Sequence, residues 1–350
     1  MLLLAVLVIV PRTVKVAAQA PTLTDIAVVT DDDPTFAPGC DAVTIIDTRT
    51  GRAIDQATYR SSPGRLAIAP GAEWIISVCN NNGPFAVLMH LRSLDLMQWT
   101  SADIGPPLLI GGPVAFAPNG SFALLARTGG LDKYAVAQFG RASIGTAEGQ
   151  HVTSSEVAMM LISHDSSRIY AIRVDGLIDI IDAATMSQIG RGIPYRPISS
   201  SRDRQRRQTF AAITPSDNYI LVNSGTPRIN IIDVTSRTST LVELPGIGEA
   251  FGLAANFALP GDVFAARGKT AVGVYRIDSA DTIKMLITTS APAQLFRTIP
   301  QSQWIVRHSE IAWTGDGKGV ITSIGGPSEF RVFDFKNEDG NYSLARRLDF

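Results

Sequence analysis

The sequence predicts an all-β fold, a seven-bladed β-propeller of four-stranded antiparallel blades, from three observations. A segment of about 45 to 50 residues recurs along the chain, which indicates one supersecondary unit stacked on copies of itself. The apolar segments are short, rich in Val, Ile and Ala, and separated by Gly, Pro, Asn and Asp, as is typical of strands. Beyond the N-terminal segment, no apolar pattern has the periodicity of an amphipathic helix.

Each repeat places a turn between its first two strands and, in most copies, ends its third strand with Asp. Pro, Gly, Asn and Asp suit such turns because they favour the required backbone conformations. The turns are Pro70-Gly71, Pro118-Asn119-Gly120, His164-Asp165-Ser166, Pro215-Ser216-Asp217, Pro260-Gly261-Asp262 and Gly315-Asp316-Gly317. The third strands with a terminal Asp end at Asp47, Asp182, Asp233, Asp278 and Asp334.

The strands follow from these signals in chain order. The first three repeats cover residues 26–30, 42–47 and 53–59; 66–69, 74–79, 85–91 and 94–99; and 114–117, 122–127, 134–139 and a weak fourth strand near His151. The other four cover residues 157–162, 169–174, 177–181 and 187–193; 210–213, 219–223, 229–232 and 238–244; 251–257, 263–267, 271–277 and 283–288; and 310–313, 319–324, 330–335 and 343–348.

A radial arrangement of these units is favoured over a linear stack. A linear stack needs polar capping units at its two ends, whereas both ends of this chain look like ordinary blade strands. The first repeat, however, lacks an innermost strand, and residues 12–19 are the one candidate for it.

Two segments carry a family resemblance. Ile45-Ile46-Asp47-Thr48, followed by Thr50-Gly51 and then Ala69-Pro70-Gly71, resembles the repeat of the YVTN-type β-propellers, and Ile231-Ile232-Asp233-Val234 with Ile213-Thr214-Pro215 repeats it. The resemblance extends over most of the chain, but the Gly-His and Trp-Asp dipeptides of tryptophan-aspartate-repeat propellers are absent. It implies the propeller fold and a tendency toward extracellular or periplasmic binding.

The N-terminus predicts export. Residues 2–10 are an unbroken apolar run, and Ala18-Gln19-Ala20 has the small-x-small pattern that signal peptidase accepts. We therefore expect a signal peptide over residues 1–20, one propeller domain over residues 21–350, and a secreted or periplasmic protein. No Lys or Arg precedes the run, and the alternative is that residues 12–19 form a strand of the fold.

Composition limits the choice of partners. With 45% hydrophobic and 18% charged residues the chain can fill a large core, and a net charge of −1 steers it toward neither nucleic acid nor an anionic membrane. The N-terminal apolar run is shorter than the roughly 20 residues that a transmembrane helix needs. We expect a monomer that binds an unidentified protein or an anionic glycan.

Three groups of residues are candidate sites. Asp31, Asp32 and Asp33 could contribute oxygen ligands to a Ca²⁺ ion, although adjacent carboxylates point apart and a solvated loop is the favoured interpretation; no other cofactor is predicted. Cys40 and Cys79 end corresponding segments of neighbouring repeats, so we expect a disulfide between them in the exported protein.

The third group consists of four arginines in a long segment between two repeats. Clustered guanidinium groups suit phosphate, sulfate or carboxylate, while a basic loop that only faces water is the simpler interpretation. The arginines are Arg202, Arg204, Arg206 and Arg207.

The sequence predicts that the protein acts as a binding or scaffolding module through its loop face, and an enzymatic function is the less favoured hypothesis. The alternative is a propeller enzyme of lactonase-like or quinoprotein-like type, with carboxylates and a His or Arg converging on the central channel. The residues that line the channel discriminate between the two: an apolar channel favours binding, and a polar cluster favours catalysis.

Overall fold

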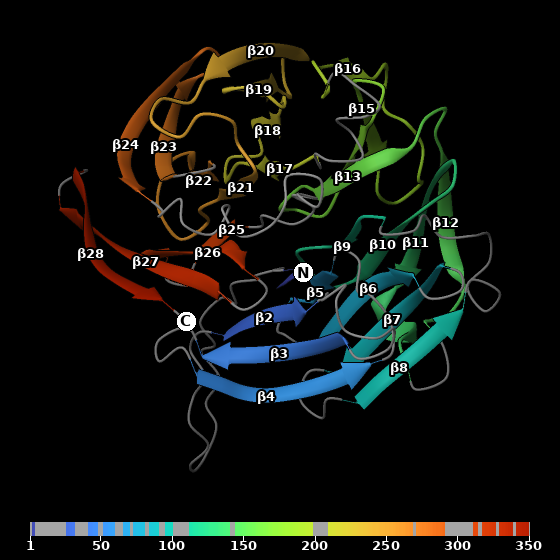
Figure 1. Cartoon of the computed structure of the whole chain (residues 1–350). Helices are drawn as coiled ribbons and strands as arrows, with labels where there is room; N and C mark the ends of the chain where they lie inside the picture. Colours follow the sequence, from blue (N-terminus) through green and yellow to red (C-terminus); the bar gives the residue numbers. More distant parts are fainter. Residues whose placement is uncertain are drawn as a thin grey trace.

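The computed structural model describes the following residues: 2–3, 26–31, 41–47, 52–59, 66–70, 73–80, 84–90, 95–100, 112–140, 144–198, 209–268, 271–290, 311–313, 317–326, 329–338 and 341–349. Within these ranges the strands form seven sheets of four strands each, and every strand pair is antiparallel (Figure 1). The only helical element there is a 3₁₀ turn over Val136–Gln138. The predicted all-β class is confirmed.

Each sheet is a simple meander of consecutive strands. The first three sheets are β1 to β4 (Leu2–Leu3, Ile26–Asp31, Asp41–Asp47, Arg52–Tyr59), β5 to β8 (Leu66–Ile68, Trp74–Asn80, Pro84–His90, Asp95–Thr100) and β9 to β12 (Val114–Phe116, Phe122–Arg127, Gly130–Ala135, Ala147–Val152). The next two are β13 to β16 (Val157–Ile162, Arg168–Arg173, Leu177–Asp182, Ile193–Pro194) and β17 to β20 (Ala211–Ile213, Tyr219–Asn223, Arg228–Asp233, Thr238–Glu243). The last two are β21 to β24 (Gly252–Ala255, Val263–Arg267, Ala271–Ser279, Thr282–Ser290) and β25 to β28 (Ile311–Trp313, Gly319–Gly326, Glu329–Glu338, Asn341–Asp349).

The sheets are arranged around a common centre, as in a propeller. The first strands contact one another in chain order, β5 with β9, β9 with β13, and so on to β25. Figure 1 shows these strands near the centre and the fourth strands, such as β8, β12 and β20, at the periphery. The propeller architecture predicted from the repeat is thereby confirmed.

In the third, fourth and fifth sheets the turns between the first and second strands lie where the repeat predicts them. The last residue of each predicted turn takes a positive φ, which is 73° at Gly120, 60° at Ser166 and 59° at Asp217. Glycine adopts this left-handed conformation without strain, whereas Ser and Asp adopt it at some cost. At Ser166 and Asp217 the side chain reaches the turn of the preceding sheet, and this contact helps to hold the conformation.

The innermost strand of the first sheet differs from the prediction. Leu2 pairs with Asp31 and Leu3 with Thr30, so β1 occupies the position for which residues 12–19 were the candidate. A ladder position requires only backbone N–H and C=O groups, and two residues suffice to supply them. Residues 4–25 lie outside the described part of the chain. Because β1 falls within the predicted signal peptide, cleavage after Ala20 would leave the first sheet with three strands.

Two further strands differ from the sequence-based boundaries. The third strand of the third sheet is β11, which begins at Gly130 rather than Tyr134, because Arg127 pairs with Gly130 across a tight Thr128-Gly129 turn. The fourth strand of the fourth sheet shrinks to β16, with a single additional bridge between Ile181 and Gln188. Gly190 and Gly192 lie in the interruption, where glycine weakens a strand.

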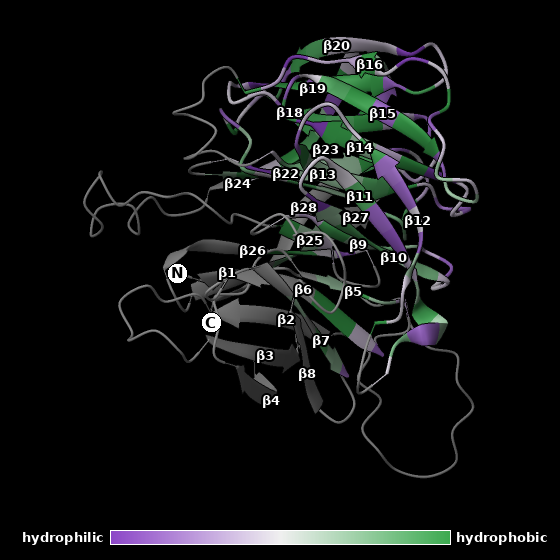
Figure 2. Cartoon of the chain, turned by 90° about the vertical axis from the view of Figure 1, so that its right-hand side faces the viewer, coloured by the Kyte–Doolittle hydropathy of each residue, from purple (hydrophilic) through white to green (hydrophobic). Residues whose placement is uncertain are grey.

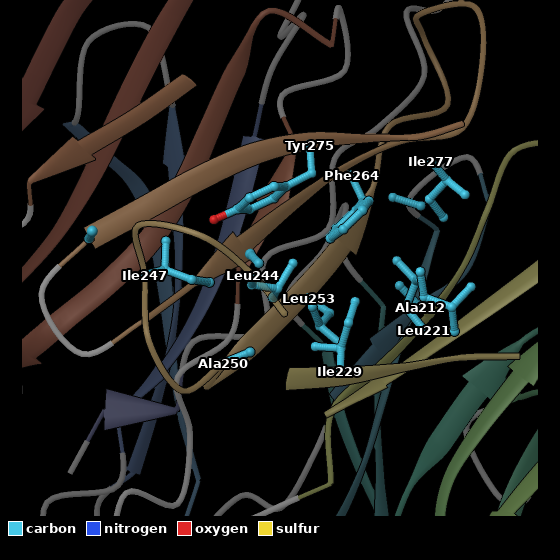
Figure 3. Packing of buried hydrophobic residues seen from close by; sticks show 14 residues of the cluster. Ala212, Leu221, Ile229, Leu244, Ile247, Ala250, Leu253, Phe264, Tyr275 and Ile277 are labelled. Carbon is cyan, nitrogen blue, oxygen red and sulfur yellow. The ribbon is translucent and has the colours of Figure 1, made fainter. Parts of the chain in front are cut away.

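The core lies between neighbouring sheets. Figure 3 shows the cluster between the fifth and sixth sheets, in which Leu221 and Ile229 face Phe264 and Tyr275. The rings of Phe264 and Tyr275 stack with centroids 5.3 Å apart, and the Tyr275 hydroxyl donates to the Pro245 carbonyl at 2.8 Å. Burying such a ring stabilises the fold by about 2–3 kcal/mol. Hydrophobic residues run along β19 in Figure 2, while the peripheral β12 is largely hydrophilic.

Across the described ranges, the structure contains no helix with the length and apolar character needed to traverse a bilayer.

Candidate functional site

Most of the sequence-predicted site residues lie outside the described part of the chain. This applies to Asp32, Asp33, Cys40 and the four arginines of residues 202–207. Asp31 ends β2 and Cys79 is in β6, but only their backbone positions are described. The calcium site, the disulfide and the arginine cluster therefore stay predictions.

The innermost strands are apolar throughout. β5 has the sequence LAI, β9 VAF, β13 VAMMLI, β17 AAI, β21 GLAA and β25 IAW. Several of these side chains, including Val114, Phe116 and Met159, are only half-buried. The described strands around the centre thus contribute no acid, base or nucleophilic side chain.

A buried ion pair joins the second and third strands of the fourth sheet. Arg173 ends β14, and Asp179 faces it from β15 with only 2% of its surface exposed. The Arg173 Nη1 donates to Asp179 Oδ2 at 3.2 Å, its Nη2 donates to Ser154 Oγ at 2.7 Å, and its Nε donates to Asp175 Oδ1 at 3.1 Å. Every edge of the guanidinium is therefore engaged.

Asp179 also has partners from other segments. Gln188 Nε2 donates to Asp179 Oδ1 at 3.2 Å, and His151 Nε2 of the third sheet lies 3.8 Å from Oδ2. Burial acts to raise the pKa of Asp179, but the interactions with His151 and Arg173 outweigh it, so this pKa lies below its ordinary value. The ion pair of the fourth sheet thus lies against a side chain of the third.

The third sheet carries the same pair with fewer partners. Arg127 Nε donates to Asp132 Oδ1 at 2.7 Å, whereas Asp132 Oδ2 accepts no hydrogen bond from the described residues although the residue is only 1% exposed. Burial raises the pKa of Asp132 above its ordinary value despite the charge of Arg127. The arginine–aspartate pair thus recurs in the third and fourth sheets, but among the described residues the additional side chains that contact Asp179 have no counterpart around Asp132.

Later sheets fill this position differently. The fifth sheet has Asn223 and Asn230: Asn223 Oδ1 accepts from Phe210 N at 2.8 Å, and Asn230 Nδ2 donates to the Arg196 carbonyl at 3.0 Å. The sixth has Arg267, whose pKa is lowered to about 10 by burial. The two asparagines connect strands with linkers, a structural role.

On the opposite face, the turns between first and second strands are joined to one another. Ser166 Oγ accepts from Asn119 N at 3.1 Å, Asp217 Oδ2 accepts from His164 N at 3.0 Å, and Asp262 Oδ2 accepts from Ser216 Oγ at 2.8 Å. A fourth bond runs from Asn256 Nδ2 to the Gly317 carbonyl at 2.9 Å. Each bond links consecutive sheets, from the third to the seventh.

The turn of the sixth sheet is longer than its counterparts and exposes an aromatic ring. It spans seven residues, 256–262, whereas the turns of the third, fourth and fifth sheets span five, at 117–121, 163–167 and 214–218. Phe257 in this turn is 58% exposed, and its ring meets that of His164 edge-on with centroids 4.7 Å apart. Since His164 belongs to the fourth sheet, the longer turn reaches past the fifth.

The turns that meet at this ring carry carboxylates. His164 Nδ1 lies 2.7 Å from Asp217 Oδ1, and Asp262 lies on the same turn as Phe257. Asp165 is exposed, and hydrogen bonds from Ser163 and Ser167 lower its pKa to about 2. The three turns contain no Lys or Arg. We call His164, Asp165, Asp217, Phe257 and Asp262 the turn patch; it is the candidate functional site.

The sequence predicted His164, Asp165, Asp217 and Asp262 only as turn residues, and it predicted Phe257 as the last residue of a strand, whereas β21 ends at Ala255. The available signal was the two additional residues in the sixth turn, one of them aromatic, where a turn residue has no packing reason to be Phe. Contact between His164 and Phe257, two repeats apart, requires the radial arrangement and is invisible in the repeat itself. Within the described ranges, no three His, Cys, Asp or Glu side chains converge in a way that would hold a metal ion.

Comparison with known proteins supports the fold. No protein-family model matches the sequence, and no curated protein matches it either. Among solved structures, the chain is similar to hydrazine synthase from Kuenenia stuttgartiensis, a β-propeller-containing protein, with a TM-score of 0.60 and 16% sequence identity over 88% of this chain and 92% of that one. At this identity the likeness concerns architecture alone, and a total of 1646 matching chains makes the fold too widespread to indicate a function.

Proposed function

We propose that this protein is an exported β-propeller binding module, a closed ring of seven blades that makes its contacts through surface turns and loops. The observation that carries the proposal is the apolar character of the described innermost strands, which contribute no reacting group of the kind that a channel enzyme needs. Loops on a stiff scaffold are the usual place for recognition.

The charged residues of the described interior support this role. Arg127 pairs with Asp132 and Arg173 pairs with Asp179, so these four side chains connect neighbouring strands of their sheets. A catalytic site would need a free acid, base or nucleophile within reach of a substrate. The lactonase-like or quinoprotein-like alternative gains no support from these strands.

The test combines photocrosslinking with cofactor analysis on the full chain. A benzophenone amino acid replaces Phe257 in one variant and the exposed Val152, at the end of β12, in another. Exposed to extracellular or periplasmic extract, a binding module should give one discrete crosslinked species from one position and not from the other. Stoichiometric metal or quinone in the purified protein, together with turnover of a lactone or alcohol, would overturn the proposal.

Export and the disulfide belong to the same proposal. N-terminal sequencing of the protein recovered outside the cytoplasm should give Pro21, the residue after Ala20. Intact mass after alkylation should show no free thiol at Cys40 or Cys79 until the protein is reduced. Retention of Met1 together with two free thiols would contradict both parts.

A further inference from the structure

We propose that the turn patch binds a basic segment of a partner protein, with a Lys or Arg side chain over the face of Phe257 and the carboxylates of the patch around it. The inference rests on the proposed binding function and names the chemistry of the partner. A cation over an aromatic face is attracted to the ring, and a desolvated pair is stabilised more than an exposed one.

The first argument is that the longer turn of the sixth sheet holds the Phe257 ring at the surface. A phenyl ring in water loses the stabilisation that burial would give, about 2–3 kcal/mol. The two additional residues of this turn place the ring against His164 rather than in the core. The His164 ring contacts Phe257 at an interplanar angle of 62°, and more than half of the Phe257 surface stays open to a partner.

The second argument is preorganisation. Asn256, which is fully buried, accepts hydrogen bonds at Oδ1 from the N–H groups of Ala258 and Leu259, at 3.0 and 3.1 Å, and donates to Gly317. The turn that carries Phe257 is thus fixed at its base from both sides. A ligand that meets a preformed surface loses less conformational entropy when it binds.

The third argument is charge complementarity. Asp165, Asp217 and Asp262 contribute three carboxylates, and the three turns that form the patch contain no Lys or Arg. Among the described residues, Arg168, directly after the turn of the fourth sheet, is the one cation that acts on Asp165, so the carboxylates of the patch outnumber it. Asp165 is ionised at any physiological pH because its pKa is about 2. An anionic or neutral segment would meet this surface with less favourable electrostatics than a basic one.

The experiment measures binding of fluorescein-labelled alternating Lys-Gly and Arg-Gly peptides, with the matched Glu-Gly peptide as a probe of charge. We expect the basic peptides to bind and the acidic one not to, with an affinity that falls as salt rises. Phe257→Ala should weaken binding roughly 2- to 30-fold, the range that a cation–π contact accounts for. Asp165→Asn, which keeps the acceptor for Ser163 and Ser167, should weaken it further.

Two control variants distinguish specific binding at the turn patch from non-specific attraction to the charge of the protein. Asp281→Asn removes a similarly exposed and hydrogen-bonded carboxylate from the turn between β23 and β24, and Val152→Ala removes another exposed apolar side chain. Neither should change the affinity by more than about twofold, since neither belongs to the patch. Unaltered thermal unfolding would confirm that Phe257→Ala folds.

Binding that Phe257→Ala and Asp165→Asn leave unchanged would overturn the inference, as would a preference for the acidic peptide or for a neutral oligosaccharide. Different outcomes would contradict the turn patch and the proposed binding function. If the basic peptides do not bind but a benzophenone at position 152 still captures a discrete partner, only the turn patch is excluded. If neither position captures a partner and the protein carries a cofactor, the binding function itself is wrong.

Discussion

The third and fourth sheets place the same ion pair in the same position, and the two carboxylates behave in opposite ways. Asp132 and Asp179 are both almost fully buried, and each faces an arginine at the end of the preceding strand. Asp179 also has Gln188 and His151 beside it, while Asp132 Oδ2 accepts nothing. The pKa of Asp179 is lowered and that of Asp132 is raised.

The comparison teaches that one opposite charge does not compensate for burial. Removing a carboxylate from water costs several kcal/mol, and the attraction of a partner offsets this only when the other lone pairs are also satisfied. Both carboxylate oxygens of Asp179 accept hydrogen bonds, whereas of the two oxygens of Asp132 only Oδ1 accepts one from the described residues. The same ion pair therefore recurs in two repeats, but the contribution of each pair to stability depends on neighbouring side chains that do not recur.

The largest effect should come from Asp179→Asn. This change removes the more buried of the two carboxylates that pair with Arg173, and breaking a buried pair by removing one member costs about 3–5 kcal/mol. Urea denaturation followed by circular dichroism measures the loss in the free energy of unfolding. The matched variant Asp132→Asn should lose clearly less, about 1–2 kcal/mol, because the ionised carboxylate it removes is already unfavourable. Equal losses would erase the distinction between the sheets.

Replacing both members of a pair should sharpen the difference. Arg127→Met with Asp132→Leu should change stability by less than about 1 kcal/mol, because an apolar pair of similar volume does not need the missing hydrogen bond. Arg173→Met with Asp179→Leu should still cost about 2–3 kcal/mol, because Gln188 then loses an acceptor and Asp175 loses a guanidinium donor. Chemical denaturation of the two double variants gives the answer, and a stabilised fourth sheet would contradict it.

The pH dependence should have opposite signs at the two sites. Asp179 has a folded-state pKa below its unfolded value, so its contribution is present above about pH 4 and is lost as the pH falls through the folded value. Asp132 has a folded-state pKa above its unfolded value, so the folded state binds more protons and its contribution becomes less favourable as the pH rises from about 4. Unfolding measured from pH 3 to pH 7, wild type against each Asn variant, should show slopes of opposite sign.

The smallest effect should come from Gln188→Ala. It removes one neutral donor from Asp179 and should cost about 0.5–1 kcal/mol. The same change should move the pKa of Asp179 upward, toward the behaviour of Asp132, which NMR titration of the carboxyl carbon can follow. An unchanged pKa would mean that Arg173 and His151 alone set it.

The sequence was sufficient to predict the architecture because its signals are local. A turn such as Pro215-Ser216-Asp217 and a strand end such as Asp233 are each encoded within a few residues, and their repetition implies stacking. Boundaries were less accurate where glycine interrupts a strand, as at Gly190, or where a tight turn starts a strand early, as at Gly130.

The turn patch and the ion pairs could not be predicted in the same way. His164 and Phe257 are 93 positions apart in the numbering and meet only because three turns lie together on one face. Arg173 and Asp179 are close in the sequence, yet nothing there shows that Ser154 and Gln188 complete the pair. Side-chain partners drawn from other repeats depend on the packing, which a periodic pattern does not encode.

The bonds that join consecutive turns also bear on how the chain acquires its fold. They connect residues 46 to 61 positions apart, about one repeat, so each can form as soon as two neighbouring sheets have been synthesised. Short sequence separations lower the entropy of loop closure and are associated with faster folding. Folding can then begin at any adjacent pair of sheets and spread in both directions around the molecule, one repeat at a time.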